Sequence, residues 1–293
     1  MGLFLASKMK IGIIDVGSNS VRLALMADGK TLYKKLATTR LGEGLSLSGL
    51  IKQEAIERTA KAIFDLKNLA ESDGAERVCV FATAAVRSAS NRQDFLNFVK
   101  ETCGIEVEVI SGEEEAKLGL SGALKGRDGG IIDVGGASTE VTVQRGGKVL
   151  YSKSVNIGTV RLFDLAGRDK DKLLSVINEK IAEYGNFNAS GFEMYTIGGT
   201  ATTLASVKHA LKIYDPAITD GTVISADEVY AIADKILSLT VEEVRAVAGM
   251  EPRRADVIGG GCLLMYGVMK KFCIDKVTVS ESDNIEGYYL EKF

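Results

Sequence analysis

The sequence predicts an α/β protein made of two similar domains that face each other across a cleft. An apolar segment ending in Asp-Val-Gly occurs twice, since GIIDVGSNSVRLALM begins at Gly12 and GIIDVGGASTEVTVQ begins at Gly130. Similar secondary-structure patterns follow each copy, as is typical of an internal duplication. The length of 293 residues leaves room for two domains, each with its own hydrophobic core.

In both copies the glycine-rich turn joins two strands. Val21, Leu23 and Leu25 alternate with other residues after the first turn, and Val141 and Val143 do so after the second. This period of two is typical of a strand. A dinucleotide-binding loop would instead open a helix and carry GxGxxG, which neither copy has. We therefore expect a β-hairpin at each copy and exclude a dinucleotide-binding fold.

The first half continues in the order βββαβαβα. After the hairpin, hydrophobic spacing predicts a strand over 31–37, a helix over 52–71, the strand RVCVFAT, a helix over 91–102, the strand IEVEVIS and a helix from Gly112.

The second half repeats this order, with insertions, after the turn-rich link KGRDGG. Its pattern predicts a strand over 148–155, a helix over 171–184, the strand EMYTI, two helices, the strand KVTVS and a final helix over 284–292. We therefore divide the chain into domains 1–126 and 127–283, whose Asp-Val-Gly turns line the cleft between them.

Composition narrows the classes of function. The 36 Lys+Arg and 39 Asp+Glu residues leave a formal net charge of −3, which gives no overall field for attracting nucleic acid or an anionic membrane. The chain has no apolar run of the roughly 20 residues that cross a bilayer, and MGLFLASKMK lacks the charge order of a signal peptide. Because Cys79, Cys103, Cys262 and Cys273 form no CxxC pair, we expect buried, reduced thiols and a cytoplasmic protein.

The single histidine, His209, lies in a helical stretch, and we assign it no role. One histidine cannot build a His-rich metal site, and most catalytic triads need a histidine at the site. If the protein is an enzyme, carboxylates must therefore carry its proton transfer.

The duplicated turns are candidate phosphate cradles, because N–H groups of a small-residue turn can converge on one anion. A single such turn would be an ordinary hairpin, but the duplication favours binding. Asp15 and Asp133 end the strands that lead into the turns, and Asp133 with Glu140 is the better pair for Mg²⁺. The predicted cradle residues are Gly17, Ser18 and Asn19 in the first copy and Gly135, Gly136, Ala137 and Ser138 in the second.

Two further glycine-rich segments could contact phosphate. YTIGGTATTLAS runs from a strand through Gly199 and Thr200 into a helix, whose first N–H groups would face the cleft. VIGGGCLLMYG carries three glycines that serve close helix packing as readily as binding, so both interpretations stay open.

The acidic run at 113–115 contains a candidate general base. Ser111 and Glu114 have capping-box spacing, and Glu113 and Lys117 have the spacing of an ion pair on a helix. Glu115 is left on an apolar face, where burial would raise its pKa and favour proton abstraction from water. Arg87, just past a strand end, is either a phosphate contact or a surface residue.

Together these segments resemble the exopolyphosphatase and guanosine pentaphosphate phosphohydrolase (Ppx/GppA) family, of the acetate kinase, sugar kinase, heat-shock chaperone and actin superfamily. The resemblance spans nearly the whole chain and is most specific in FATAAVR, ISGEEEA and DVGGASTE. It implies two ribonuclease-H-like domains in a short form of the family, with the helix 284–293 crossing back to the first domain. Two positions depart from the family pattern: Ala137 stands at a frequent glycine, and Asp220 stands at a frequent histidine, so any substrate contact there stays open.

The resemblance also implies roles for particular residues. Glu115 would be the catalytic base, Asp133 and Glu140 would help to hold Mg²⁺, and Arg22, Arg87 and Arg254 would contact phosphate or substrate. The expected reaction is release of orthophosphate from the end of linear polyphosphate, with guanosine pentaphosphate as a second substrate and a homodimer as the common assembly. A kinase or ATPase of the same superfamily, and a polyphosphate or alarmone sensor without catalysis, are the alternatives.

Overall fold

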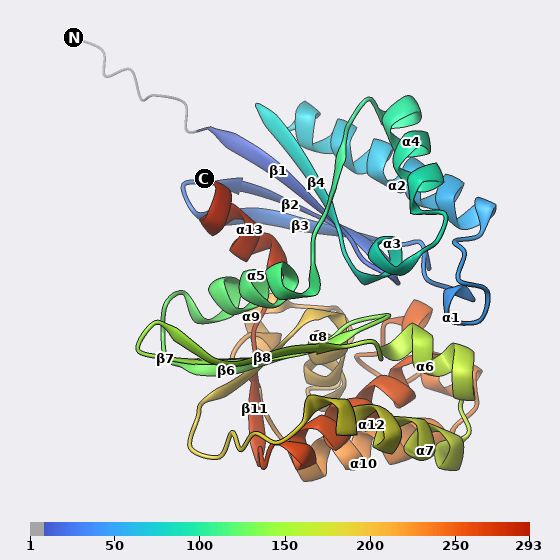
Figure 1. Cartoon of the computed structure of the whole chain (residues 1–293), viewed down its shortest axis with the longest axis vertical. Helices are drawn as coiled ribbons and strands as arrows, with labels where there is room; N and C mark the ends of the chain where they lie inside the picture. Colours follow the sequence, from blue (N-terminus) through green and yellow to red (C-terminus); the bar gives the residue numbers. More distant parts are fainter. Residues whose placement is uncertain (1–8) are drawn as a thin grey trace.

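The computed structural model describes residues 9–293, so the expectation for MGLFLASKMK falls almost entirely outside the described residues. Two α/β domains lie one above the other, joined by the segment that follows α5 (Figure 1). This arrangement confirms the predicted fold class. The first sheet ends at Val109 and the second begins at Gly129.

The first domain contains a five-stranded sheet in the order β3-β2-β1-β4-β5. The first three strands are antiparallel, and β4 and β5 run parallel to β1, which is the ribonuclease-H-like arrangement. Its elements are β1 (Lys10–Val16), β2 (Ser20–Ala27), β3 (Lys30–Thr38), α1 (Leu45–Ser48), α2 (Gln53–Ser72), β4 (Arg77–Ala82), α3 (Ala84–Ser88), α4 (Arg92–Cys103), β5 (Val107–Val109) and α5 (Gly112–Leu124).

The second domain repeats this sheet and extends it. Its order is β10-β11-β9-β6-β7-β8, so β6, β7 and β8 match β1, β2 and β3, while β10 adds an antiparallel edge strand that the sequence pattern did not predict. Its elements are β6 (Gly129–Val134), β7 (Thr139–Arg145), β8 (Lys148–Val155), α6 (Thr159–Ala166), α7 (Lys170–Ile181), η1 (Ala182–Tyr184), β9 (Met194–Ile197), α8 (Gly198–Lys208), α9 (Pro216–Thr219), β10 (Val223–Ser225), α10 (Ala226–Ser238), α11 (Val241–Arg245), η2 (Pro252–Arg254), α12 (Ile258–Lys271), β11 (Lys276–Val279) and α13 (Asn284–Lys292).

Helices α5 and α13 form a layer between the two sheets (Figure 1). Leu118 of α5 and Ile285 of α13 pack with residues of the first sheet, and Ala123 of α5 packs with Ile131 of the second. The two helices touch through glycine, because a Cβ at Gly122 would lie 2.0 Å from the carbonyl oxygen of Asp283. The last helix of the chain is therefore held against the middle of the molecule.

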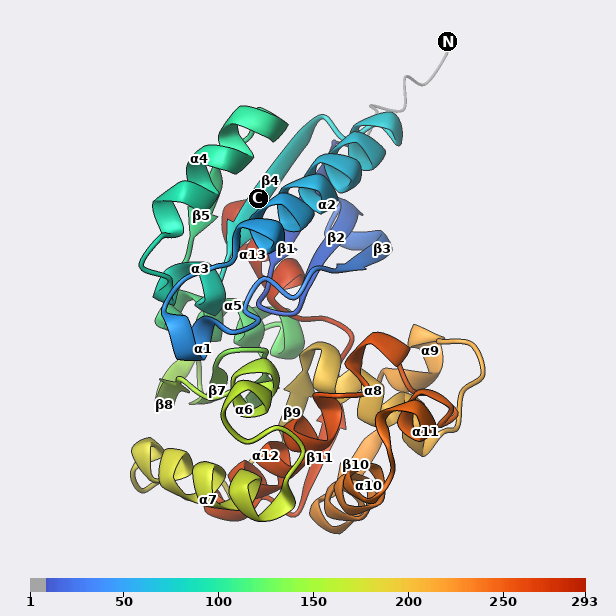
Figure 2. The same ribbon diagram turned by 90° about the vertical axis from the view of Figure 1, so that its right-hand side faces the viewer.

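The outer layers are amphipathic helices that each cover one face of a sheet. Helices α2 and α4 lie side by side over the first sheet, with Ile56, Ile63 and Phe95 buried beneath them (Figure 2). Helices α7, α10 and α12 cover the second sheet, where Leu173 and Leu263 join the largest core. The polar residues between these apolar positions face water, as expected for helices with one buried side.

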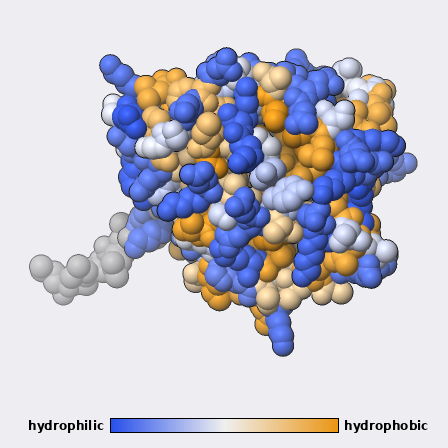
Figure 3. All heavy atoms as spheres, turned by 90° about the horizontal axis from the view of Figure 1, so that it is seen from below, coloured by the Kyte–Doolittle hydropathy of each residue, from blue (hydrophilic) through white to orange (hydrophobic). Residues whose placement is uncertain are grey.

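On the face seen from below, hydrophilic and hydrophobic residues are interspersed (Figure 3). Within residues 9–293, none of the helices has the length and apolar character needed to cross a bilayer. All four cysteines are free, but only Cys103 and Cys262 are buried, and Cys273 is exposed, which corrects the expectation of four buried thiols.

Candidate active site

The two Asp-Val-Gly turns have the same backbone geometry. The N–H of Gly17 donates to the carbonyl of Ser20 at 3.0 Å, and the N–H of Gly135 donates to the carbonyl of Ser138 at 3.0 Å. The following segments hold the carbonyls of both turns, since Ser18 accepts from Gly42 at 2.8 Å and Gly136 accepts from Val160 at 2.8 Å. In each turn, therefore, a carbonyl group at the tip already accepts a hydrogen bond from the segment that follows.

The N–H groups at the tips of the turns are left without partners. Those of Ser18, Asn19, Gly136 and Ala137 donate no hydrogen bond to any residue in the described part of the chain. Unpaired N–H groups at a buried turn favour an anionic ligand. The tips also touch, because a Cβ at Gly136 would lie 2.6 Å from the Cβ of Ser18.

A cavity of about 80 Å³ lies where the two turns meet. It brings together most of the residues that the sequence nominated, although they come from both domains and from α13. Its lining consists of Asp15, Gly17, Ser18, Asn19, Ser20, Arg22, Thr83, Ala84, Glu115, Asp133, Val134, Gly135, Gly136, Ala137, Ser138, Gly198, Gly199, Arg254 and Asn284.

Asp15 is paired with a cation in the first domain. It lies opposite Arg22 in the β1–β2 ladder, and its Oδ2 accepts from Arg22 Nε at 3.2 Å and also from Arg22 Nη2. The other terminal nitrogen of Arg22 donates to Asp283, which caps α13. Arg22 is thus held by two carboxylates, while Asp15 Oδ1 is buried with no partner.

Three further carboxylates crowd the second domain's side of the cavity. Asp133 and Glu140 lie opposite each other in the β6–β7 ladder, and Glu115 enters from α5. All three are at most 8% exposed. Ser154 donates to Glu140 Oε1 at 2.5 Å, but Glu140 Oε2 is buried without a partner. Glu140 lies behind the cavity and does not line it.

Burial and mutual repulsion make these groups weaker acids. Burial raises the pKa of Asp133 to about 8, with the Glu115 carboxylate adding to the increase. Burial also raises the pKa of Glu140 well above its ordinary value, again with a contribution from Glu115. The pKa of Glu115 itself is raised by burial, although the Arg87 guanidinium opposes this. Without a bound cation, the site therefore favours the protonated, uncharged forms of these carboxyl groups.

Arg87 orients Glu115. Its Nη1 donates to Glu115 Oε2 at 3.0 Å and to the carbonyl of Ile110 at 2.9 Å, which fixes the end of β5 against α5. The predicted capping box of Ser111 and Glu114 is present at the start of α5. The expected pair of Glu113 with Lys117 is absent, because Lys117 pairs with Glu291 of α13 at 2.6 Å.

Arg254 supplies a buried cation with no protein partner. Its side chain packs over Gly199, where a Cβ would lie 2.0 Å from Nη2, and it makes no hydrogen bond or ion pair within residues 9–293. Burial lowers its pKa to about 10, still above neutrality. The hydroxyl of Thr200 donates to the carbonyl of Val134 at 2.8 Å, so only the backbone of Thr200 is left for a ligand.

The structure places the glycines at 259–261, His209 and Asp220 outside the lining of the cavity. The glycines at 259–261 lie inside α12 and are buried, and a Cβ at Gly261 would lie 2.4 Å from Thr159 Cγ2, so they serve close helix contact. His209 ends α8 and its Nε2 lies 2.9 Å from the hydroxyl of Thr222, away from the cavity lining. Asp220 accepts from the N–H of Glu281 at 2.9 Å.

The sequence reasoning missed Thr83, Asp283 and Asn284. Thr83 lines the cavity and hydrogen-bonds Glu115, and Asn284 Nδ2 donates to Asp133 Oδ2 at 3.4 Å. Thr83 is the third residue of FATAAVR, so that motif is a signal from which it can be predicted. Asp283 and Asn284 lie far along the chain, and only folding brings them to the turns.

The donor set fits a divalent cation that shares its coordination with phosphate. Within the described range no three Asp, Glu, His or Cys side chains are grouped to hold an ion by themselves. Mg²⁺ commonly uses one or two protein carboxylates, with waters and phosphate oxygens completing its shell. Asp133 and Glu140 offer hard oxygen donors, and Glu140 Oε2 has no hydrogen-bond partner. A bound cation would favour the ionised forms of both carboxyl groups, which burial disfavours.

Comparisons with known proteins agree with this geometry. The model of the Ppx/GppA phosphatase family matches residues 23–293, so the chain belongs to that family. Exopolyphosphatase 2 of Mycobacterium tuberculosis is 30% identical, over 96% of this chain and 98% of its own length. A bifunctional 3-dehydroquinate synthase/phosphatase of Fusobacterium nucleatum is 29% identical, and the chain spans only 46% of that protein.

Solved structures give the same result. A crystal structure of an exopolyphosphatase-like protein superimposes with a TM-score of 0.88 at 27% identity, covering 97% of this chain and 98% of the other. The Ppx/GppA enzyme of Aquifex aeolicus gives a TM-score of 0.77 at 29% identity, covering 98% and 100%. An exopolyphosphatase from Cytophaga hutchinsonii gives 0.83 at 25%, covering 96% and 97%.

Proposed function

We propose that this phosphatase hydrolyses the terminal phosphoanhydride of linear polyphosphate, with guanosine pentaphosphate as a second substrate. The observation that carries the proposal is the buried carboxylate of Glu115, held by Arg87 at 3.0 Å beside two turns with unpaired N–H groups. The names of the mycobacterial exopolyphosphatase and of a Photobacterium profundum guanosine-5′-triphosphate,3′-diphosphate pyrophosphatase, 26% identical, support the two substrates.

In the proposed mechanism the turns and Arg254 bind the terminal phosphate, because they offer N–H donors and a cation with no protein partner. Glu115 takes the proton from the attacking water at its carboxylate, and its raised pKa makes it a stronger base. Arg87 keeps that carboxylate pointed at the cavity and has donors left for a phosphate oxygen. Asp133 and Glu140 would hold Mg²⁺, which when bound neutralises charge on the phosphate.

The test is phosphate release from long-chain polyphosphate and from guanosine pentaphosphate, with Mg²⁺ present. Wild-type protein should release orthophosphate, and Glu115→Gln should bind polyphosphate without releasing it. A sensor would bind both substrates and release nothing in either form of the protein, which would overturn the proposal. A kinase would instead need an acceptor and would transfer the phosphate to it.

The Mg²⁺ requirement and a homodimeric assembly belong to the same proposal. The carboxylates of the second domain support the first, and the family resemblance supports the second. Activity in excess chelator would contradict the metal requirement. Sedimentation of the purified chain at micromolar concentration would show directly whether it is a dimer.

A further inference from the structure

The start of α13 joins the two halves of the site. Asp283 and Asn284 follow the last strand by only a few residues and are each 4% exposed. Asp283 contacts Arg22 of the first domain, and Asn284 contacts Asp133 of the second. Two neighbouring residues at the end of the chain thus reach the duplicated aspartates of both domains.

The contact of Asp283 determines which oxygen Asp15 presents. Arg22 bridges the two carboxylates, so Asp15 Oδ2 is fully engaged and only Oδ1 is left toward the cavity. The other oxygen of Asp283 accepts from the N–H of Ile285 at 3.1 Å, within a capping box that Glu286 completes. The position of Asp15 is therefore coupled to the first turn of α13.

The contact of Asn284 is direct. Its amide nitrogen donates to Asp133 Oδ2 at 3.4 Å, while its Oδ1 is buried without a partner and packs against Gly119, where a Cβ would lie 2.8 Å away. The side chain has little freedom, because Gly119 of α5 confines its oxygen and Asp133 accepts from its nitrogen. An amide in this place restrains Asp133 without adding charge to a site that already holds the carboxyl groups of Asp15, Glu115, Asp133 and Glu140.

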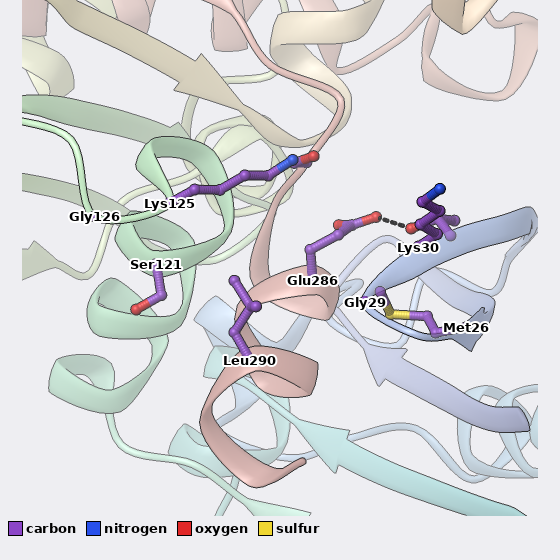
Figure 4. Close-up of a pocket in the computed structure, with 10 residues that line it drawn as sticks. Met26, Gly29, Lys30, Ser121, Lys125, Gly126, Glu286 and Leu290 are labelled. Atoms are coloured by element: carbon purple, nitrogen blue, oxygen red, sulfur yellow. Dashed lines mark hydrogen bonds between the residues drawn. The ribbon is translucent and has the colours of Figure 1, made fainter. Parts of the chain in front are cut away.

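A second set of contacts anchors α13 away from the site. Glu286 accepts from the hydroxyl of Thr31 at 2.7 Å and pairs with Lys34 at 2.8 Å. Glu286 also lines a cavity of about 670 Å³ between the β2–β3 hairpin, α5 and α13, whose lining includes none of the predicted site residues (Figure 4). Glu286 thus fixes the first turn of α13 on β3, and changing the side chains of Asp283 and Asn284 leaves these contacts of Glu286 in place.

We propose that Asp283 and Asn284 are positioning residues that hold Asp15 and Asp133 at the spacing the divalent cation and the phosphate require. The inference rests on the proposed function for its catalytic consequence, but the cation affinity does not depend on any substrate. It assigns to the crossing helix a role in the chemistry as well as in domain packing.

The test uses Asn284→Ala and Asp283→Asn, with Thr31→Val as the matched control. Asparagine caps a helix as well as aspartate does, so Asp283→Asn keeps the cap while removing the charge that faces Arg22. Thr31→Val loosens the same helix on the side away from the site. Thermal unfolding of each variant shows that it is folded before it is used.

Mn²⁺ binding without substrate, measured by electron paramagnetic resonance, is the first readout. We expect Asn284→Ala to raise the Mn²⁺ dissociation constant at least about fivefold, Asp283→Asn to raise it by a smaller factor, and Thr31→Val to leave it within about twofold. In phosphate release from polyphosphate, Asn284→Ala should lower kcat more than it raises KM.

The outcomes separate the two proposals. Wild-type Mn²⁺ affinity and kcat in both folded variants would overturn the positioning role while leaving the hydrolase proposal standing. An equal effect in Thr31→Val would also overturn it, because the cause would then be general loosening of α13. If the wild type released no phosphate, the proposed function would fail, and Mn²⁺ affinity alone would still decide the role of Asn284.

Discussion

The two hairpins of the duplication have the same backbone and opposite electrostatics. Asp15 faces Arg22 across the first ladder, and Asp133 faces Glu140 at the same register of the second. The first pair is an ion pair, but the second is two buried carboxylates whose pKa values are both raised by burial. The protein itself supplies the cation for the first copy, whereas no ion pair neutralises the two carboxyl groups of the second within the described residues.

The proposed roles of the two hairpins differ accordingly. The first hairpin ties its turn to α13 through Arg22 and Asp283, which holds Asp15 in place. The second places two carboxyl groups without a paired cation near Glu115, where the proposed metal would bind. Both turns keep N–H groups without partners in the described part of the chain, so the proposed phosphate binding draws on donors from both copies.

The largest expected effect is a difference in stability when the Asp15–Arg22 pair and the Asp133–Glu140 pair are each changed at one residue. Arg22→Met leaves Asp15 and Asp283 buried without a cation, and breaking a buried pair in this way costs about 3 kcal/mol or more. Glu140→Gln should instead stabilise the metal-free protein, because it removes a carboxyl group whose ionised form burial disfavours. Urea denaturation of both variants in chelator measures the two changes. Equal destabilisation by both would contradict the comparison.

The next effect concerns the carboxylate that lies between the hairpins. Glu115→Gln keeps the shape but cannot accept the proton, so turnover should fall by at least roughly 100-fold. Phosphate release at saturating polyphosphate measures it, with circular dichroism as the control for folding. Turnover close to wild type in the folded variant would remove Glu115 as the base.

A smaller effect distinguishes the two aspartates as metal ligands. Asp133→Asn should raise the Mg²⁺ concentration for half-maximal activity by about tenfold, since a charged oxygen donor is lost. Asp15→Asn should raise it by a smaller factor, because Arg22 already engages one oxygen of that carboxylate and only Oδ1 is left without a partner. The measurement is the rate of phosphate release by each variant as a function of Mg²⁺ concentration. A larger increase of the half-maximal Mg²⁺ concentration in Asp15→Asn than in Asp133→Asn would place the cation in the first domain.

The smallest effect is on the pH dependence of stability. The folded pKa of Asp133, about 8, is above its unfolded value near 4, so the stability it contributes is present at low pH and is lost as pH rises through 8. The Tm of the metal-free protein should therefore fall by a few degrees between pH 6 and 9, and Asp133→Asn should reduce the fall. A Tm that rises over this range would contradict the raised pKa.

The sequence by itself determined the fold class, the duplicated hairpins and the burial of Glu115, the residue proposed as the base. Local spacing suffices for these: period-two residues predict β2, the strand over 148–155 matches β8, and Glu115 stood out as a carboxylate on an apolar helix face. The family followed from several motifs along the chain, of which the repeated turn is one. Such features depend on neighbours a few residues apart along the chain.

Only the tertiary structure decided which charges meet. Arg22 was predicted to contact phosphate, but folding places Asp283 against it from the far end of the chain, and Lys117 finds Glu291 in place of Glu113. Asn284 reaches Asp133 in the same way. Sequence spacing predicts partners within one helix or hairpin, whereas an ion pair between distant segments depends on how α5 and α13 cross between the two sheets.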